Sequence, residues 1–149
     1  MNLVLAPSKQ DYWSAKLSVL TMTLTGILTA IHHLYRFGFE VIVPAVIVIA
    51  LPYLLMRWFW RGGKWLAFAA YGIFTALIIL RFGISDGFLD HIVKFLGGTP
   101  IHFLPESPIV GDLLYETTGI LSFVASTFAA YYLYKFIRDT LRVALPDKS

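Results

Sequence analysis

Four long apolar stretches constrain the fold of this chain more than any other feature of its sequence. Each holds the roughly 20 mostly apolar residues that an α-helix needs to cross about 30 Å of hydrocarbon. Because a bilayer offers no water to bond an exposed backbone, such stretches fold as helices. We place them at about residues 13–35, 41–60, 65–84 and 113–137. The sequence therefore predicts an all-α integral membrane protein, one domain over residues 1–149, built as a four-helix transmembrane bundle.

The composition agrees with this class and excludes others. Hydrophobic residues make up 58% of the chain and charged residues 14%, against about 25% charged in ordinary soluble domains. The net charge of +3 does not indicate nucleic-acid binding, because the cations lie at the ends of the predicted helices. The absence of cysteine excludes disulfides, thiolate metal sites and thiol catalysis.

Basic and aromatic residues predict how the bundle is oriented. With four spans, both termini and the second loop lie on one side, and this side holds most of the Lys and Arg residues and all four Trp residues. By the positive-inside rule that side is the cytoplasm, and the Trp residues form the interfacial belt. We therefore expect a multi-pass protein of the plasma (inner) membrane with cytoplasmic termini. The basic residues on that side are Lys9, Lys16, Arg57, Arg61, Lys64, Lys135, Arg138, Arg142 and Lys148.

A short extracytoplasmic helix is expected between the third and fourth spans, at about residues 86–96. Ser85 is a good N-cap and Gly97 a good helix terminator. Between them, Phe88, Leu89, Ile92 and Leu96 recur at helical spacing, which predicts an apolar stripe on an interfacial helix that lies against the bundle.

Polar and small residues mark the faces along which the spans should pack. The first span carries hydroxyl residues on one face that leads to His32; they are Ser14, Ser18, Thr21, Thr25 and Thr29. These hydroxyls either bond back to the preceding helical turn and serve as small packing residues, or form a polar seam below His32. The fourth span has a small-residue face that includes Gly119 and Ser122, so we expect it to pack against the first.

All four histidines and most acidic residues fall on the extracytoplasmic side, and this sorting predicts a metal site. Imidazole and carboxylate without thiol suit Zn, Fe, Mn or Cu(II). Ionisable groups a turn inside a membrane helix are functional candidates because an unpaired charge there is costly. His32 is the leading ligand, and Asp86 is either a ligand or an acceptor that holds a His tautomer. The candidate metal ligands are His32, His33, Asp86, Asp90, His91 and Glu116.

Other interpretations of these residues remain open. A solvated helix face explains Asp90, His91 and Lys94 equally well, and a structural hydrogen bond between helices explains His32 with Glu116 equally well. Haem ligated by two histidines is a weaker candidate, because all four histidines lie at one surface. A nucleophilic serine enzyme has no support, since no Ser lies in a GxSxG context.

The functional prediction is a small membrane protein with a His/carboxylate transition-metal site at its extracytoplasmic face, for metal handling, sensing or metal-dependent chemistry. Whether it is an enzyme is left open. Two alternatives come from other classes: an accessory or assembly subunit of a larger membrane complex, and a small homo-oligomeric channel or transporter. The expected partners are the lipid bilayer and either another membrane protein or further copies of the chain, and no nucleic acid.

Overall fold

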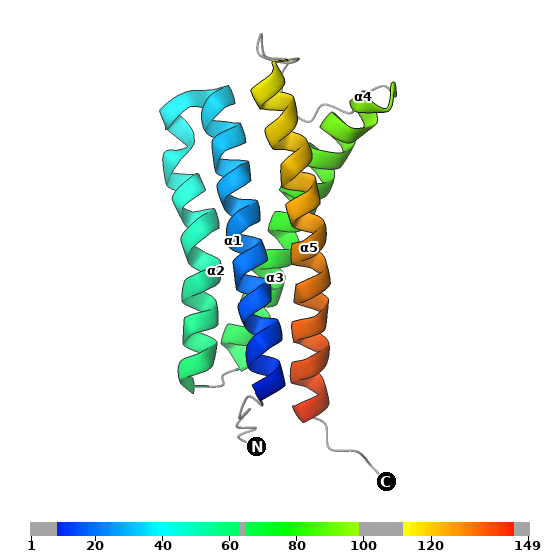
Figure 1. Ribbon diagram of the computed structural model, residues 1–149. Coiled ribbons are helices and arrows are strands. Elements are labelled where there is room, and N and C mark those ends of the chain that lie inside the picture. Colours follow the sequence, from blue (N-terminus) through cyan, green and yellow to red (C-terminus); the bar gives the residue numbers. More distant parts are fainter. Residues whose placement is uncertain (1–8, 63–64, 99–111, 145–149) are drawn as a thin grey trace.

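The computed structural model describes residues 9–62, 65–98 and 112–144, and these residues contain helices and no strand (Figure 1). The first helix, α1 (Lys9–Phe37), is joined by the 3₁₀ turn η1 (Gly38–Val41) to α2 (Ile42–Gly62). The remaining elements are α3 (Trp65–Ile78), the π-helix η2 (Ile79–Ile92), the short α4 (Val93–Phe95) and α5 (Leu113–Ala144).

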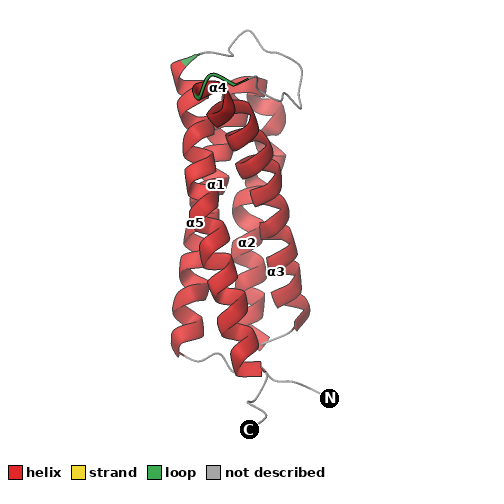
Figure 2. Ribbon diagram, turned by 90° about the vertical axis from the view of Figure 1, so that its right-hand side faces the viewer, coloured by secondary structure: helices red, strands yellow, loops and turns green. Residues whose placement is uncertain are grey.

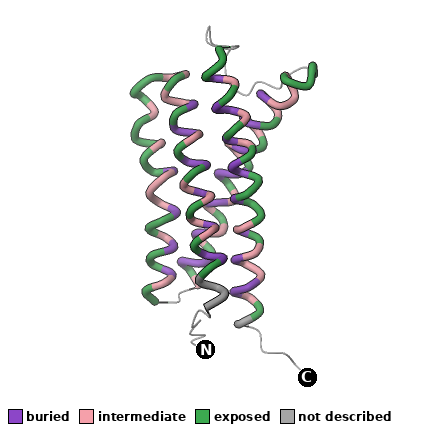
Figure 3. Tube along the Cα trace, in the orientation of Figure 1, coloured by how far each residue is buried: buried purple, intermediate pink, exposed green. Residues whose placement is uncertain are grey.

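The long helices stand side by side along one axis, as Figure 2 shows from a second direction. The helix α1 packs most extensively against α5, which confirms the contact expected from their small and polar faces. It also packs against α2, to which η1 joins it. The buried positions lie on the inward faces of the helices (Figure 3).

Within the described residues, three helical stretches are long and apolar enough to cross a membrane: Trp13–Gly62, Trp65–Phe95 and Leu113–Arg142. The first contains both α1 and α2, because η1 joins them without a break in helical structure. Many large apolar side chains, such as Leu20, Val43 and Ile73, are exposed on the outside of these helices.

The interior near the chain ends is aromatic and apolar. Phe59 of α2, Phe68 of α3 and Phe136 of α5 pack with their rings 5.4–6.0 Å apart. Tyr71 lies in the same cluster, and its hydroxyl is 2.7 Å from the hydroxyl of Ser18. This aromatic packing holds α2, α3 and α5 together at the end of the molecule opposite the histidines.

Some hydroxyl residues of α1 bond back along their own helix, as the packing interpretation predicts, and one does not. Thr21 donates to the carbonyl of Leu17 at 2.8 Å, and Thr25 donates to that of Thr21 at 3.0 Å, as expected for hydroxyls that bond back along their own helix. Thr29 is buried, and its hydroxyl has no hydrogen-bond partner within the described part of the chain. The packing interpretation therefore fits the middle of α1, and Thr29 departs from it just below His32.

The segment after α3 differs from the expectation. Instead of a break at Ser85 and a separate helix over about 86–96, α3 continues without interruption through η2 into α4. Ser85 is no N-cap; its hydroxyl donates to the carbonyl of Leu80, five residues earlier, at 3.0 Å. Of the expected apolar stripe, Leu96 is exposed, whereas the ring of Phe88 packs against Phe123 of α5 with the centroids 5.2 Å apart.

The π-helix and its glycines bring η2 close to α5. A Cβ on Gly87 would lie 2.8 Å from the Cβ of Phe123, and a Cβ on Gly83 would overlap Ser126. The helices meet at a distance that only glycine permits. Because π-helical hydrogen bonds run from i to i+5, Asp86 and His91 lie on the same side of η2, whereas a regular α-helix would set them about 140° apart.

Candidate metal centre

Three buried side chains from two helices meet inside the bundle, near the end of the molecule where α1 joins α2. His32 comes from α1, and Asp86 and His91 come from η2. Their exposed fractions are 1%, 5% and 1%. One ligand atom from each lies within 4.8 Å of the others, so the group can bind a metal ion. Donors bound to a single metal at up to 2.1 Å lie no more than about 4.2 Å apart, so modest side-chain rotations close the group around an ion.

The ring of His32 is held in one orientation by α5. Its Nδ1 lies 3.1 Å from the carbonyl oxygen of Tyr115 and 3.1 Å from the hydroxyl of Thr118. Since a carbonyl can only accept, Nδ1 carries the hydrogen and donates it. In the neutral ring, Nε2 is then a lone-pair acceptor, and it lies 3.5 Å from Oδ2 of Asp86. That distance is too long for a hydrogen bond.

The ring of His91 is held by a carboxylate. Its Nδ1 lies 2.8 Å from Oε2 of Glu116. The other carboxylate oxygen of Glu116 accepts a hydrogen bond from the ammonium group of Lys94. A histidine whose Nδ1 donates to a carboxylate presents Nε2 as a more basic ligand, an arrangement that recurs behind metal-binding histidines.

Two imidazole nitrogens of the centre are acceptors that lack a donor among the described residues. Among the described residues, neither Nε2 atom has a hydrogen-bond partner, and both are fully buried. Leaving a buried acceptor unpaired costs about 1–3 kcal/mol. A cation between His32, His91 and Asp86 would satisfy all three groups at once, and it would neutralise the buried carboxylate.

Tyr115 and Gly119 shape the wall of the centre on α5. The Tyr115 ring stacks on that of His32 with centroids 4.2 Å apart, and its centroid lies 4.9 Å from that of His91. Arg36 donates a hydrogen bond to the Tyr115 hydroxyl at 2.6 Å. Gly119 leaves room for the His91 ring, since a Cβ at position 119 would overlap the Cδ2 and Nε2 atoms of that ring. Both imidazoles are therefore fixed by packing as well as by hydrogen bonds.

The other predicted ligands lie around this group and not in it. Nδ1 of His33 donates to the carbonyl of Thr29 at 3.0 Å, and its ring packs edge-on against Phe82. Asp90 is 7% exposed and lies on η2 between the two ligands, and Glu116 contacts the far side of His91. His102, the fourth histidine of the chain, was not a candidate ligand and lies outside the described residues.

Several contributors to the centre were not predicted from the sequence. Gly119 was noted only as a small packing residue, and Tyr115 and Thr118 were not singled out. All three lie on α5 at spacings of three and four residues, which places them on one face. An aromatic residue, a hydroxyl and a glycine at this spacing, beside Glu116, are the signal that could have identified this face.

Comparisons with known proteins found no match: no family model fits the chain, and no curated protein or solved structure is similar to it. The chemical capacity of the centre therefore rests on its geometry. Two imidazoles and one carboxylate are the donor set of non-haem Fe(II) sites and of catalytic zinc sites, both of which keep at least one coordination position open.

Proposed function

We propose that this chain is an integral membrane protein that binds one transition metal ion through His32, Asp86 and His91. The observation that carries the proposal is the pair of buried Nε2 atoms without hydrogen-bond partners in the described residues, beside a buried carboxylate. A purely structural His–Asp network would place a proton between nitrogen and oxygen at hydrogen-bond distance. The distance between Nε2 of His32 and Oδ2 of Asp86 is 3.5 Å, which is longer than a hydrogen bond.

The remaining predicted residues support the ion from outside its coordination sphere. Glu116 orients His91 and raises its basicity, and Lys94 in turn orients Glu116. Asp90 adds a second buried carboxylate on η2, which increases the attraction for a cation. His33 forms the wall between the ion and the space beside α2. These assignments give each of the six candidate ligands a role in a single site.

The donor set favours iron or zinc, with manganese and copper(II) as weaker candidates. Imidazole binds Zn, Cu and Fe, and two histidines with one carboxylate are typical of non-haem Fe(II). Haem is disfavoured, because the rings of His32 and His91 are only 4.8 Å apart and a porphyrin between two axial histidines needs them on opposite faces. The site suits metal sensing or metal-dependent chemistry, since three protein ligands leave room for an exogenous one.

The setting of the site follows from the apolar helices. We place the centre at the extracytoplasmic end of a four-span bundle in the plasma membrane, with both termini in the cytoplasm. The support is the excess of basic residues near the chain ends and the second loop. Ionisable side chains at this depth destabilise the fold unless their charges are paired or neutralised by a bound ion.

Elemental analysis of the purified protein tests the proposal. The protein is expressed with a histidine-free affinity tag, so that no tag residue binds metal, and it is extracted in mild detergent. We expect close to one metal ion per chain in the wild type and a large loss in His32→Ala and Asp86→Asn. Asp112→Asn is the matched control for the carboxylate, because Asp112 is exposed and caps α5, and Asn caps equally well.

Reconstitution distinguishes a lost ion from a site that binds none. Apo protein is incubated with Fe(II), under anaerobic conditions, or with Zn(II), and unbound metal is removed. A wild-type protein that retains no metal in either case contradicts the proposal. So does retention of the metal in Asp86→Asn at the level of Asp112→Asn. Monodisperse elution of each variant in size-exclusion chromatography shows that the comparison is made on folded protein.

A further inference from the structure

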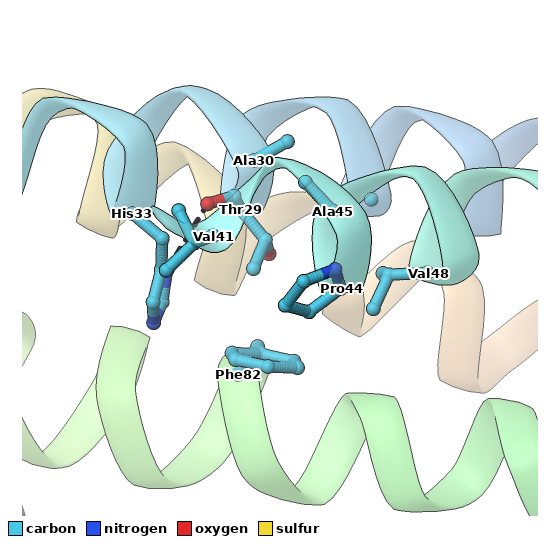
Figure 4. Close-up of a pocket in the computed structure, with 9 residues that line it drawn as sticks. Thr29, Ala30, His33, Val41, Pro44, Ala45, Val48 and Phe82 are labelled. Carbon is cyan, nitrogen blue, oxygen red and sulfur yellow. Dashed lines mark hydrogen bonds between the residues drawn. The ribbon is translucent and has the colours of Figure 1, made fainter. Parts of the chain in front are cut away.

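A small cavity lies directly beside the metal centre, between α1, α2 and η2 (Figure 4). Its volume is about 70 Å³. The wall on α2 is apolar and consists of Pro44, Ala45 and Val48, and Phe82 closes the side toward η2. Pro44 is exposed on the outer surface of α2, so the cavity extends from that surface into the bundle.

The inner wall of the cavity is one helical turn from the proposed ligands. Thr29 precedes His32 by three residues, and Phe82 precedes Asp86 by four. His33 lies between the two spaces: it lines the cavity, and it interacts electrostatically with Asp86. Figure 4 shows the His33 ring beside Phe82, at the end of the cavity that is nearer to the outer ends of α1 and α2. The His33 ring, whose centroid is 5.3 Å from that of His32, therefore borders both the cavity and the metal centre.

An open coordination position needs a route for the ligand that fills it. Tyr115 and Thr118 of α5 cover His32 on one side, and Glu116 covers His91 on another. Gly119 is in direct contact with the His91 ring. On the side of α1 and α2, the cavity brings open space to within one residue of the centre.

We propose that this cavity admits a small uncharged molecule to the open coordination position of the bound metal. The inference rests on the proposed function, since without a metal there is no position to fill. The apolar walls exclude an ion, which would lose its hydration there. The volume is about half of the ~150 Å³ of an apolar cavity that holds benzene, so the ligand is smaller than a benzene ring. A diatomic gas has this size and polarity.

Nitric oxide is the probe for this proposal, because it is small, uncharged and gives a characteristic absorption and EPR spectrum on non-haem Fe(II). The iron-loaded protein is mixed with nitric oxide in a stopped-flow instrument, and the association rate constant is measured. Ala45→Phe places a ring in the cavity from α2, away from the metal ligands. Val46→Phe is the matched control, because Val46 is the next residue and faces outward with 58% of its surface exposed.

We expect the association rate to fall by about tenfold or more in Ala45→Phe, because the added ring fills the cavity that we propose as the route to the metal. Ala45→Leu, which fills less of the cavity, should give an intermediate rate and guards against overpacking by the ring. Val46→Phe should bind nitric oxide as fast as the wild type. Iron content and the final spectrum should be the same in all four proteins, since the coordinating residues are unchanged.

Three results would overturn the inference and leave the metal site standing. The first is an iron-loaded wild type that does not bind nitric oxide. The second is an unchanged association rate in both Ala45 variants, and the third is an equal decrease in Val46→Phe. Failure of the proposed function appears earlier and differently, as a wild-type protein that retains no iron before nitric oxide is added.

Discussion

Gly119 contributes to the metal centre because, without a side chain, it leaves space for the His91 ring. The His91 ring occupies the space that a Cβ at position 119 would need. Gly119→Ala should displace the imidazole and weaken metal binding by at least about tenfold, as expected when a ligand's orientation is lost. The helix itself should not suffer, since alanine is the better helix former. A metal-binding isotherm checks this, with Thr117→Ala, at an exposed position of the same helix, as the control.

Glu116 should affect the metal without touching it. Its carboxylate accepts a hydrogen bond from Nδ1 of His91 at 2.8 Å. Glu116→Gln keeps the size of the side chain but removes the charge, so we expect the dissociation constant for the metal to rise by about tenfold to a hundredfold. The bound metal should keep its histidine ligands, which the absorption spectrum of Co(II)-loaded protein reports. A Co(II) spectrum that shows a changed coordination geometry in Glu116→Gln would instead assign Glu116 to direct coordination.

The sequence supplied the residue types of the centre but not their pairing. His32 was the leading ligand because it continues the polar face of α1, and the structure places it in the buried group. Glu116 was expected near His32, yet it contacts His91, and Asp86 lies near His32. These pairings depend on how far η2 is rotated relative to α5. The residue pattern of a single helix does not predict how that helix is rotated relative to its neighbour.

At the scale of the elements, the approach of η2 to α5 depends on glycine. A Cβ on Gly87 would lie 2.8 Å from the Cβ of Phe123 and 3.1 Å from the carbonyl oxygen of Gly119. Gly87→Ala should therefore push the helices apart and destabilise the fold by about 1–3 kcal/mol, the usual range for overpacking. Gly72→Ala lies in the same continuous helix, but its Cβ would meet only Ile137 at 3.9 Å, so it should be neutral or slightly stabilising.

Unfolding in detergent by heat or denaturant measures this difference between the two glycine variants. The metal content of Gly87→Ala should fall together with its stability, because Asp86 and His91 are held by the same helix contact. Equal stability of Gly87→Ala and Gly72→Ala would show that η2 and α5 do not pack as closely as the structure has them.

The helices were predictable at this scale, and the π-helix was not. Apolar stretches marked the long helices because length and composition suffice for that purpose. The apolar stripe that suggested a separate helix over residues 86–96 is only partly buried, and the buried face of η2 carries Gly83, Asp86, Gly87, Asp90 and His91. Along η2, small and polar side chains fill the contact with α5. Hydrophobic periodicity therefore does not mark the buried face of this element.

At the scale of the whole molecule, the proposed topology can be tested by labelling, because the chain has no cysteine of its own. Leu96→Cys lies beyond α4 and is 74% exposed at the native residue, and Arg61→Cys lies at the opposite end, in the last turn of α2. In intact cells, a membrane-impermeant maleimide should label position 96 only. Position 61 should react after the membrane is permeabilised. The reverse pattern would place the metal centre on the cytoplasmic side.

Anomalous X-ray diffraction from crystals of the metal-loaded protein tests whether one metal ion lies between α1 and η2. Data collected on both sides of the absorption edge of the metal locate the ion without reference to the protein density. We predict a single anomalous peak at about 2.0–2.2 Å from an imidazole nitrogen of His32, an imidazole nitrogen of His91 and a carboxylate oxygen of Asp86. A peak elsewhere, or metal-loaded crystals with no peak between these three side chains, would contradict it.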